Sequence, residues 1–193
     1  MPRQEEGRLS RSERRAEREA HQKQIEQRYR KQRQRNVAAI PGVHTLALVL
    51  DNLKAGFNVP KIFRSAQAFG AAQVHLVDIG VFDPAPAKGA FRKVPAKFHE
   101  TYDQAHADLL EQGYTIYALA PNAEKKLTET VLAEKSAFVI GHEEVGLSFD
   151  VTDFVEIKSL SIPHFSEMES LNASVAASIV MYEYIKQHGK EPS

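Results

Sequence analysis

Three short stretches of the chain carry polar side chains whose types and spacing suit chemistry on a bound ligand. The first stretch runs from Asn58 to Arg64. Arg64 follows Ile62 by two residues, and Ile62 begins an apolar stripe with Ala66 and Phe69, so Arg64 points about 200° away from that stripe in a helix. We expect Asn58 to cap the start of this helix and Arg64 to face a cleft. A capped helix with an exposed arginine and no chemical role gives the same pattern.

Two glycines enclose the second stretch, which reads GHEEVGLS at residues 141–148. Gly141 lets a ligand approach the backbone closely, and Gly146 permits a sharp turn. Glu143 lies between them, although an acidic turn without a chemical role has the same composition. His142 has no second histidine at ligand spacing beside it, so we expect no metal site here.

Small and polar residues dominate the third stretch, which follows Ile162-Pro163 and reads SLNASVAA at residues 170–177. Ser170 is a good helix N-cap. The small side chains let a ligand or another backbone pack closely against the start of the helix, although simple helix packing explains them equally. We expect this helix to bury a stripe formed by Leu171, Val175, Ile179 and Tyr182.

The rest of the chain alternates between predicted strands and predicted helices. Continuous apolar runs such as VHTLALVLD are typical of buried parallel strands. This alternation predicts an α/β fold with a parallel sheet, and such sheets bind ligands beyond the carboxyl ends of their strands, where the polar stretches lie. We expect strands at 43–51, 73–78, 114–119, 137–141 and 154–157, a long loop at 79–100, and helices at 58–69, at 103–112 and from Glu167 or Ser170 to 187.

Charge is distributed unevenly along the chain. The 193 residues hold 25 Lys or Arg and 25 Asp or Glu, yet residues 1–36 hold 12 basic and 6 acidic side chains, a net charge of +6. Residues 37–193 therefore carry −6. We divide the chain into a basic arm, 1–36, that is helical or disordered without a partner, and a globular domain, 37–193. Such an arm favours a polyanionic partner, with a solvated tail as the alternative.

Composition excludes several classes of protein. The chain has no cysteine, which rules out disulfides, thiolate-bound metals and cysteine nucleophiles. It has no apolar run of about 18 residues that would serve as a membrane helix, and its N-terminus has no apolar signal segment. We therefore expect a cytoplasmic protein with no membrane partner.

The order and spacing of the three polar stretches together resemble those of the SpoU (TrmH) family. The similar features are Asn-x5-Arg at 58–64, Gly-x-Glu-x-x-Gly-Leu-Ser at 141–148 and Ile-Pro-x7-Leu-Asn-x-Ser-Val-Ala at 162–176. The resemblance extends over residues 43–187. Members of this family are S-adenosylmethionine-dependent RNA ribose 2′-O-methyltransferases of the SPOUT superfamily. The chain departs from the family pattern at Pro60, at His142 and at 164–167, where the family usually has small residues.

The resemblance implies further structural features. It implies a C-terminal trefoil knot in the parallel-sheet domain, a homodimer, and S-adenosylmethionine bound in the knot without a metal. The residues that match the cofactor-binding positions of the family are Leu119, Gly141, Ile162, Ser170 and Leu171. Those that match its polar active-site positions are Asn58, Arg64, Glu143 and Asn172.

The implied reaction moves a methyl group from S-adenosylmethionine to a ribose 2′-hydroxyl of tRNA or rRNA. Arginine is a poor base because its pKa exceeds about 12, so we expect Arg64 to hold a phosphate and stabilise the developing alkoxide. Glu143 would orient Arg64 or Asn172. The alternative is a non-catalytic RNA-binding or assembly factor with the same fold. A small-molecule enzyme is disfavoured because Gly-x-Gly-x-x-Gly does not follow the first strand.

Overall fold

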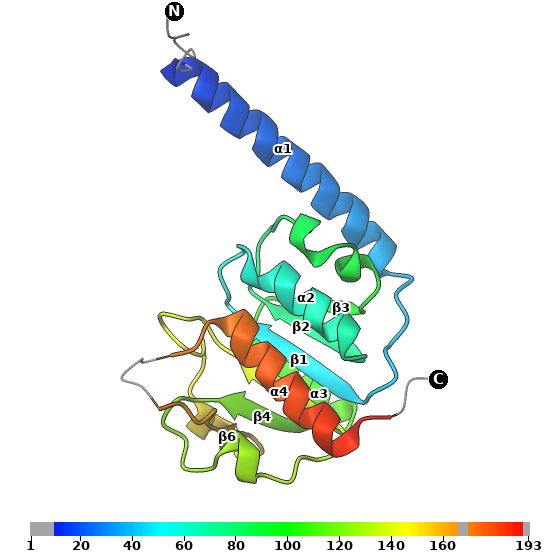
Figure 1. Ribbon diagram of the computed structural model, residues 1–193, viewed down its shortest axis with the longest axis vertical. Coiled ribbons are helices and arrows are strands. Elements are labelled where there is room, and N and C mark those ends of the chain that lie inside the picture. The colour runs from blue at the N-terminus through cyan, green and yellow to red at the C-terminus, as the bar shows by residue number, and fades with distance from the viewer. Residues whose placement is uncertain (1–9, 166–169, 191–193) are drawn as a thin grey trace, which may run out of the picture.

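A six-stranded parallel sheet forms the centre of the protein (Figure 1). The structure is a computed structural model that describes residues 10–165 and 170–190. Its strands lie in the spatial order β3-β2-β1-β5-β4-β6, and all neighbouring pairs are parallel. The predicted α/β fold with a parallel sheet is confirmed. The strands are β1 (Leu46–Asp51), β2 (Gln73–Val77), β3 (Ala96–His99), β4 (Thr115–Leu119), β5 (Ser136–Ile140) and β6 (Lys158–Leu160).

Helices cover both faces of the sheet. On one face Leu48 of β1 belongs to a core shared with α2 and α4, and on the other face Val49 belongs to a core shared with α3. Because side chains alternate across a strand, β1 is buried on both sides, which explains its continuous apolar sequence. No helix in the described chain is long and apolar enough to cross a membrane. The helices are α1 (Arg11–Asn36), α2 (Asn58–Ala68), α3 (Tyr102–Glu111) and α4 (Ala173–His188).

Two expectations about the strands are wrong. The segment 79–100 is not a loop throughout, because it contains the edge strand β3, which follows Pro95 directly and is only half-buried. The strand expected at 154–157 is not formed, and β6 pairs with β4 in its place. Phe154 packs against Tyr102 of α3, with ring centroids 5.2 Å apart. Its apolar character therefore reflects contact with a helix and not strand pairing.

The helix α1 projects from the domain and is joined to it only near its C-terminal end (Figure 1). Ser10 and Glu13 form a capping box at its start, and residues 11–24 are exposed. Tyr29 is buried, with its ring 5.1 Å from that of Phe82. Asn36 is also buried, and its side chain bonds the backbone of the segment 91–96. The last turns of α1 are thus part of the folded core, although the boundary at residue 36 stays a prediction.

The helix α4 buries a different face from the one expected. Val175 and Tyr182, predicted to be buried, are 47% and 64% exposed. The close approach of α4 to the sheet is made by its small residues, since Ala173 and Ala177 are buried there. Val175 and Tyr182 therefore form an exposed stripe of α4 that faces outward beside α2. The buried residues of α4 are Ala173, Ala176, Ala177, Val180, Met181, Glu183 and Tyr184.

Candidate cofactor cavity and active site

A cavity of about 320 Å³ lies at the carboxyl ends of β4, β5 and β6, beside the start of α4. The polar side chains His142, Glu143 and Glu144 contribute to a lining that is otherwise mostly apolar, as is typical of sites for small organic cofactors. All five residues predicted to contact the cofactor line this cavity, namely Leu119, Gly141, Ile162, Ser170 and Leu171.

Residues 166–169 lie outside the described residues. They include Glu167, the alternative start predicted for the last helix, and part of the departure from the family pattern at 164–167.

The loop after β5 closes tightly on itself. The backbone N–H of His142 donates to the carbonyl of Gly146 at 2.8 Å, and the N–H of Gly146 donates back to His142 at 2.9 Å. Gly146 has a φ of +76°, which confirms the predicted sharp turn. A Cβ atom on Gly141 would lie 2.6 Å from the carbonyl of Gly146. Glycine is therefore required at position 141 because the loop itself packs against it, whether or not a ligand is bound.

Asp51 anchors the far end of the same loop. This residue ends β1 and is fully buried. Its carboxylate accepts the backbone N–H of Ser148 at 2.6 Å and the hydroxyl of Ser148 at 2.7 Å. Burial raises the pKa of Asp51, and the two hydrogen bonds from Ser148 partly oppose that rise. The sequence analysis did not identify this residue, because an acidic residue at a strand end has no distinctive spacing.

Three of the four predicted active-site residues meet in one hydrogen-bonded chain beside the cavity. The amide nitrogen of Asn58 donates to Glu143, which also lines the cavity. The amide nitrogen of Asn172 donates to the side-chain oxygen of Asn58 at 3.1 Å. The segments that follow β1 and β5 and the start of α4 are therefore joined at one point.

The helix caps differ from those predicted. Asn58 is the first residue of α2 and does not cap it, because its side chain is engaged with Glu143 and Asn172. Ser170 does not cap α4 either. The cap is Asn172, whose side-chain oxygen accepts the N–H of Ser174 at 3.0 Å. Asn172 is thus both the last residue of the hydrogen-bonded chain and the N-cap of α4.

Arg64 lies apart from this chain of contacts. It is exposed, as predicted, and lines a separate groove between α2 and α4. Within the described residues it makes no hydrogen bond or ion pair with Glu143 or Asn172. Glu143 therefore orients Asn58, and neither of the two residues expected. The groove is also lined by Lys61, Ser174 and the exposed stripe of α4.

Two of the departures from the family pattern, Pro60 and His142, have local structural explanations. Pro60 is buried in the first turn of α2, where proline is tolerated because the first N–H groups of a helix have no partner within it. The ring nitrogen Nδ1 of His142 accepts the N–H of Glu144 at 3.0 Å. Glu144 in turn pairs with Lys54 at 2.6 Å, which links the turn to the segment after β1. His142 thus stabilises the turn in this chain.

A family model and two named methyltransferases match the part of the chain that forms this site. The SpoU rRNA Methylase family model matches residues 45–182. A 23S rRNA (guanosine-2′-O-)-methyltransferase RlmB from Nitrosomonas europaea is 31% identical over 150 residues, which are 75% of this chain and 57% of that protein. A tRNA (guanosine(18)-2′-O)-methyltransferase from Thermus thermophilus is 27% identical over 150 residues, which are 75% of this chain and 76% of that protein.

A solved structure has the same fold. The SpoU methyltransferase AviRb from Streptomyces viridochromogenes, in complex with the cofactor AdoMet, superposes with a TM-score of 0.66 at 22% identity. The alignment covers 77% of this chain and 59% of AviRb. The chain thus spans little more than half the length of AviRb and of the Nitrosomonas relative.

Proposed function

The chain belongs to the SpoU rRNA methylase family, and from this we propose that it transfers a methyl group from S-adenosylmethionine to a ribose 2′-hydroxyl of tRNA or rRNA. The observation that carries the proposal is that Glu143 belongs both to the cavity and to the hydrogen-bonded polar chain. This residue lines the cavity and also holds Asn58 in the polar chain. The cavity and the polar residues are therefore parts of one site at the carboxyl ends of the strands.

The size and lining of the cavity support S-adenosylmethionine as its ligand. Leu119, Ile162 and Leu171 offer apolar contacts, and the backbone around Gly141 offers polar ones. When bound, the cofactor supplies a methyl group already activated by a positive sulfur, so the protein must position two reactants and remove one proton. The cavity walls would hold the cofactor and exclude water from its reactive end.

The polar chain would position the nucleotide. Asn58 and Asn172 each have amide groups held by defined partners, so they can orient a ribose at small entropic cost. Arg64 would hold a phosphate of the RNA. Its guanidinium is exposed and lies apart from the polar chain, which supports a contact with the RNA backbone rather than with the reacting hydroxyl.

A comparison of Glu143→Ala with Glu111→Ala, which changes an exposed glutamate of α3 away from the cavity, tests the function. Total RNA from a strain lacking the gene is incubated with each protein and labelled S-adenosylmethionine, and 2′-O-methylation is mapped by nucleotide. We expect the wild type and Glu111→Ala to restore one or a few sites, and Glu143→Ala to restore none while still folding. A wild-type protein that binds RNA and the cofactor yet restores no site would favour the non-catalytic assembly factor.

The helix α1 would supply contacts to the RNA backbone. Residues 25–36 hold five Lys or Arg and one Glu, and this half lies next to the domain. Phosphate contacts release counterions, so affinity should fall steeply with salt. Deleting residues 1–24 keeps Tyr29 and Asn36 in the core, and we expect it to weaken RNA binding modestly and to reduce the salt slope. An unchanged slope would show that residues 1–24 do not contact phosphate.

The exposed stripe of α4 supports a homodimer. Val175, Ile179 and Tyr182 line the groove with Phe69 of α2, and contiguous apolar surface of this kind marks interaction sites. We expect a dimer by analytical ultracentrifugation and a monomer for Tyr182→Glu, with Glu111→Gln, on the exposed end of α3, as the control. A monomeric wild type would exclude this assembly.

The trefoil knot and the cytoplasmic location are also part of the proposal. The chain leaves the edge strand β6 and returns to pack α4 on α2, at the middle of the sheet. This return path supports a knotted C-terminal part. A cytoplasmic location is consistent with a tRNA or rRNA substrate.

A further inference from the structure

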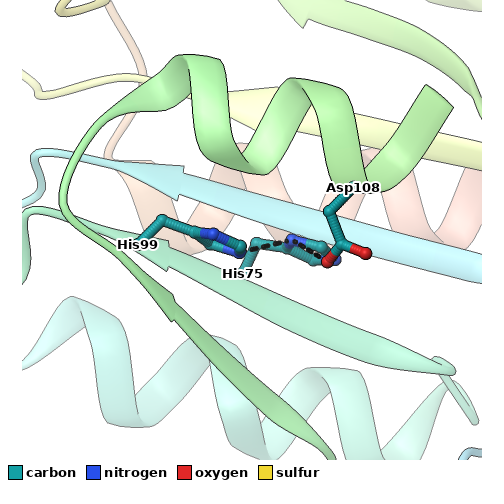
Figure 2. Close-up of side chains that lie close together, drawn as sticks. All are labelled: His75, His99 and Asp108. Carbon is teal, nitrogen blue, oxygen red and sulfur yellow. Dashed lines mark hydrogen bonds and ion pairs between the residues drawn. The ribbon is translucent and has the colours of Figure 1, made fainter. Parts of the chain in front are cut away.

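A cluster of potential metal ligands lies at the opposite half of the sheet from the cavity. His75 of β2, His99 of β3 and Asp108 of α3 point toward one another beneath α3 (Figure 2). One ligand atom from each lies within 4.8 Å of the other two. Nδ1 of His75 is 3.0 Å from Nε2 of His99 and 3.9 Å from Oδ2 of Asp108.

We propose that these three residues bind a divalent transition-metal ion of the Zn²⁺ class. Two imidazole nitrogens and one carboxylate oxygen form a ligand set that such ions favour. His99 and Asp108 are only half-buried, so water can reach the cluster and fill the remaining position. The proposal is independent of methyl transfer, because the cavity is built on β4, β5 and β6.

The spacing of the ring nitrogens is close to what a bound ion requires. Zinc–nitrogen bonds of about 2.0–2.1 Å in tetrahedral geometry hold two nitrogens roughly 3.4 Å apart. The observed separation of 3.0 Å therefore has to open by a few tenths of an ångström. Because the two ring planes are within 6° of parallel, at least one ring must also turn so that both nitrogens face the ion. Without an ion, the two nitrogens share one hydrogen bond, and the ion would replace that bond.

The imidazole of His75 has one nitrogen in the cluster and one without a partner. Its side chain is fully buried, and Nδ1 faces His99 and Asp108. Nε2 has no hydrogen-bond partner among the described residues, so an ion bound at Nδ1 would leave Nε2 to carry the ring proton.

Lys97 would compete with a metal ion for the carboxylate of Asp108 in the same cluster. Its ammonium nitrogen lies 2.7 and 2.9 Å from the two carboxylate oxygens of Asp108. The side chain is 39% exposed, so it can turn into solvent when an ion takes its place. This competition predicts that removing the lysine charge strengthens metal binding, whereas a purely structural role for the cluster predicts no such gain.

Spectroscopic titration of the untagged full-length protein with Co²⁺, followed by displacement with Zn²⁺, tests the site. We expect one Co²⁺ per chain with the visible absorption of a tetrahedral ion. His99→Gln should weaken binding at least about tenfold, by analogy with losses at metal ligands and their supports. Lys97→Met should strengthen it about tenfold, because a nearby positive charge is removed. His21→Gln, which changes an exposed histidine of α1, is the matched control and should bind as the wild type does.

The outcomes that overturn the proposal are specific. They are a wild type without a Co²⁺ spectrum at millimolar ion, and a His99→Gln variant that binds as tightly as His21→Gln. Unfolding curves in chelator identify any variant that is simply unfolded. If His99→Gln does not fold, Lys97→Met decides alone, and an affinity equal to or below that of the wild type refutes the site.

Discussion

Replacing Asp51 by alanine is expected to loosen one wall of the cavity. The carboxylate of Asp51 holds both the N–H and the hydroxyl of Ser148, so the variant frees the far end of the loop 141–148. The near end stays attached through the turn between His142 and Gly146. The variant therefore changes the mobility of the loop without removing any side chain that lines the cavity.

The size of the effect follows from two opposing contributions. Two hydrogen bonds to a charged group stabilise by about 1.5–3 kcal/mol each. The buried carboxylate is also poorly solvated, which is why burial raises the pKa of Asp51, and alanine relieves this penalty. We expect a net loss of about 2 kcal/mol in unfolding free energy. We also expect the affinity for S-adenosylmethionine to fall about tenfold, because the loop 141–148 would adopt the binding conformation in a smaller fraction of the molecules.

Urea unfolding and calorimetric titration with S-adenosylmethionine measure the two quantities. Ser148→Ala should lose about 1.5 kcal/mol because it keeps the backbone hydrogen bond, and the double variant should be less destabilised than the sum of the two. Asp150→Ala is the control, since its carboxylate is exposed and, among the described residues, bonds only Thr152. Wild-type cofactor affinity in a folded Asp51→Ala variant would refute the role of this anchor.

The pH dependence of stability gives an independent test of the same residue. The pKa of Asp51 is raised in the folded state by burial, so the folded protein holds its proton more tightly than the unfolded chain does. Its contribution to stability is therefore full below the ordinary value of about 3.9 and is lost as pH rises through the raised pKa. Relative to Asp51→Asn, which does not titrate, the wild type should gain stability as the pH falls toward 4. A constant difference would show that burial does not govern this carboxyl.

Three further substitutions test the remaining contacts. Asn172→Ala should cost about 1 kcal/mol through loss of the cap of α4 and lower kcat more than cofactor affinity, whereas Ser170→Ala should leave stability unchanged in urea unfolding. Gly141→Ala should destabilise by about 1–3 kcal/mol and weaken cofactor binding, because its Cβ would meet the carbonyl of Gly146 at 2.6 Å. Gly80→Ala, whose Cβ would have no atom of the described residues within 4 Å, should bind the cofactor normally. Asn36→Ala should lower the urea midpoint by breaking the bonds between α1 and the segment 91–96, while Gln34→Ala, which is exposed, should not.

The central strands could be predicted from sequence, and the edge strands could not. β1 and β5 are buried on both faces, so their residues form continuous apolar runs. β3 follows a proline and is half-exposed, and β6 has only three residues, so neither produces such a run. The burial of Tyr29 on α1 was missed for a related reason. A single aromatic residue in a polar helix gives no periodic signal, although it fixes that helix to the core.

The site was predictable to the extent that sequence position determines it. Asn58 and Glu143 follow strands whose carboxyl ends share one edge of the sheet, so their proximity follows from the α/β alternation. The contact of Asn172 with Asn58 depends on the path of α4 back to α2, and only the family resemblance indicated it. His75, His99 and Asp108 come from a central strand, an edge strand and a helix, and they lie close together in the fold. No motif in the sequence predicts this proximity.

The contacts around Glu143 argue that cofactor binding and substrate positioning are coupled in this protein. The loop that carries Glu143 forms a wall of the cavity and is held at one end by Asp51. Glu143 in turn holds Asn58, and Asn58 holds the residue that caps α4. A ligand that restricts the remaining motion of the loop therefore also restricts the two asparagines, which reduces the entropy lost when the second reactant binds. This coupling predicts that S-adenosylmethionine tightens RNA binding, and that RNA tightens cofactor binding by the same factor.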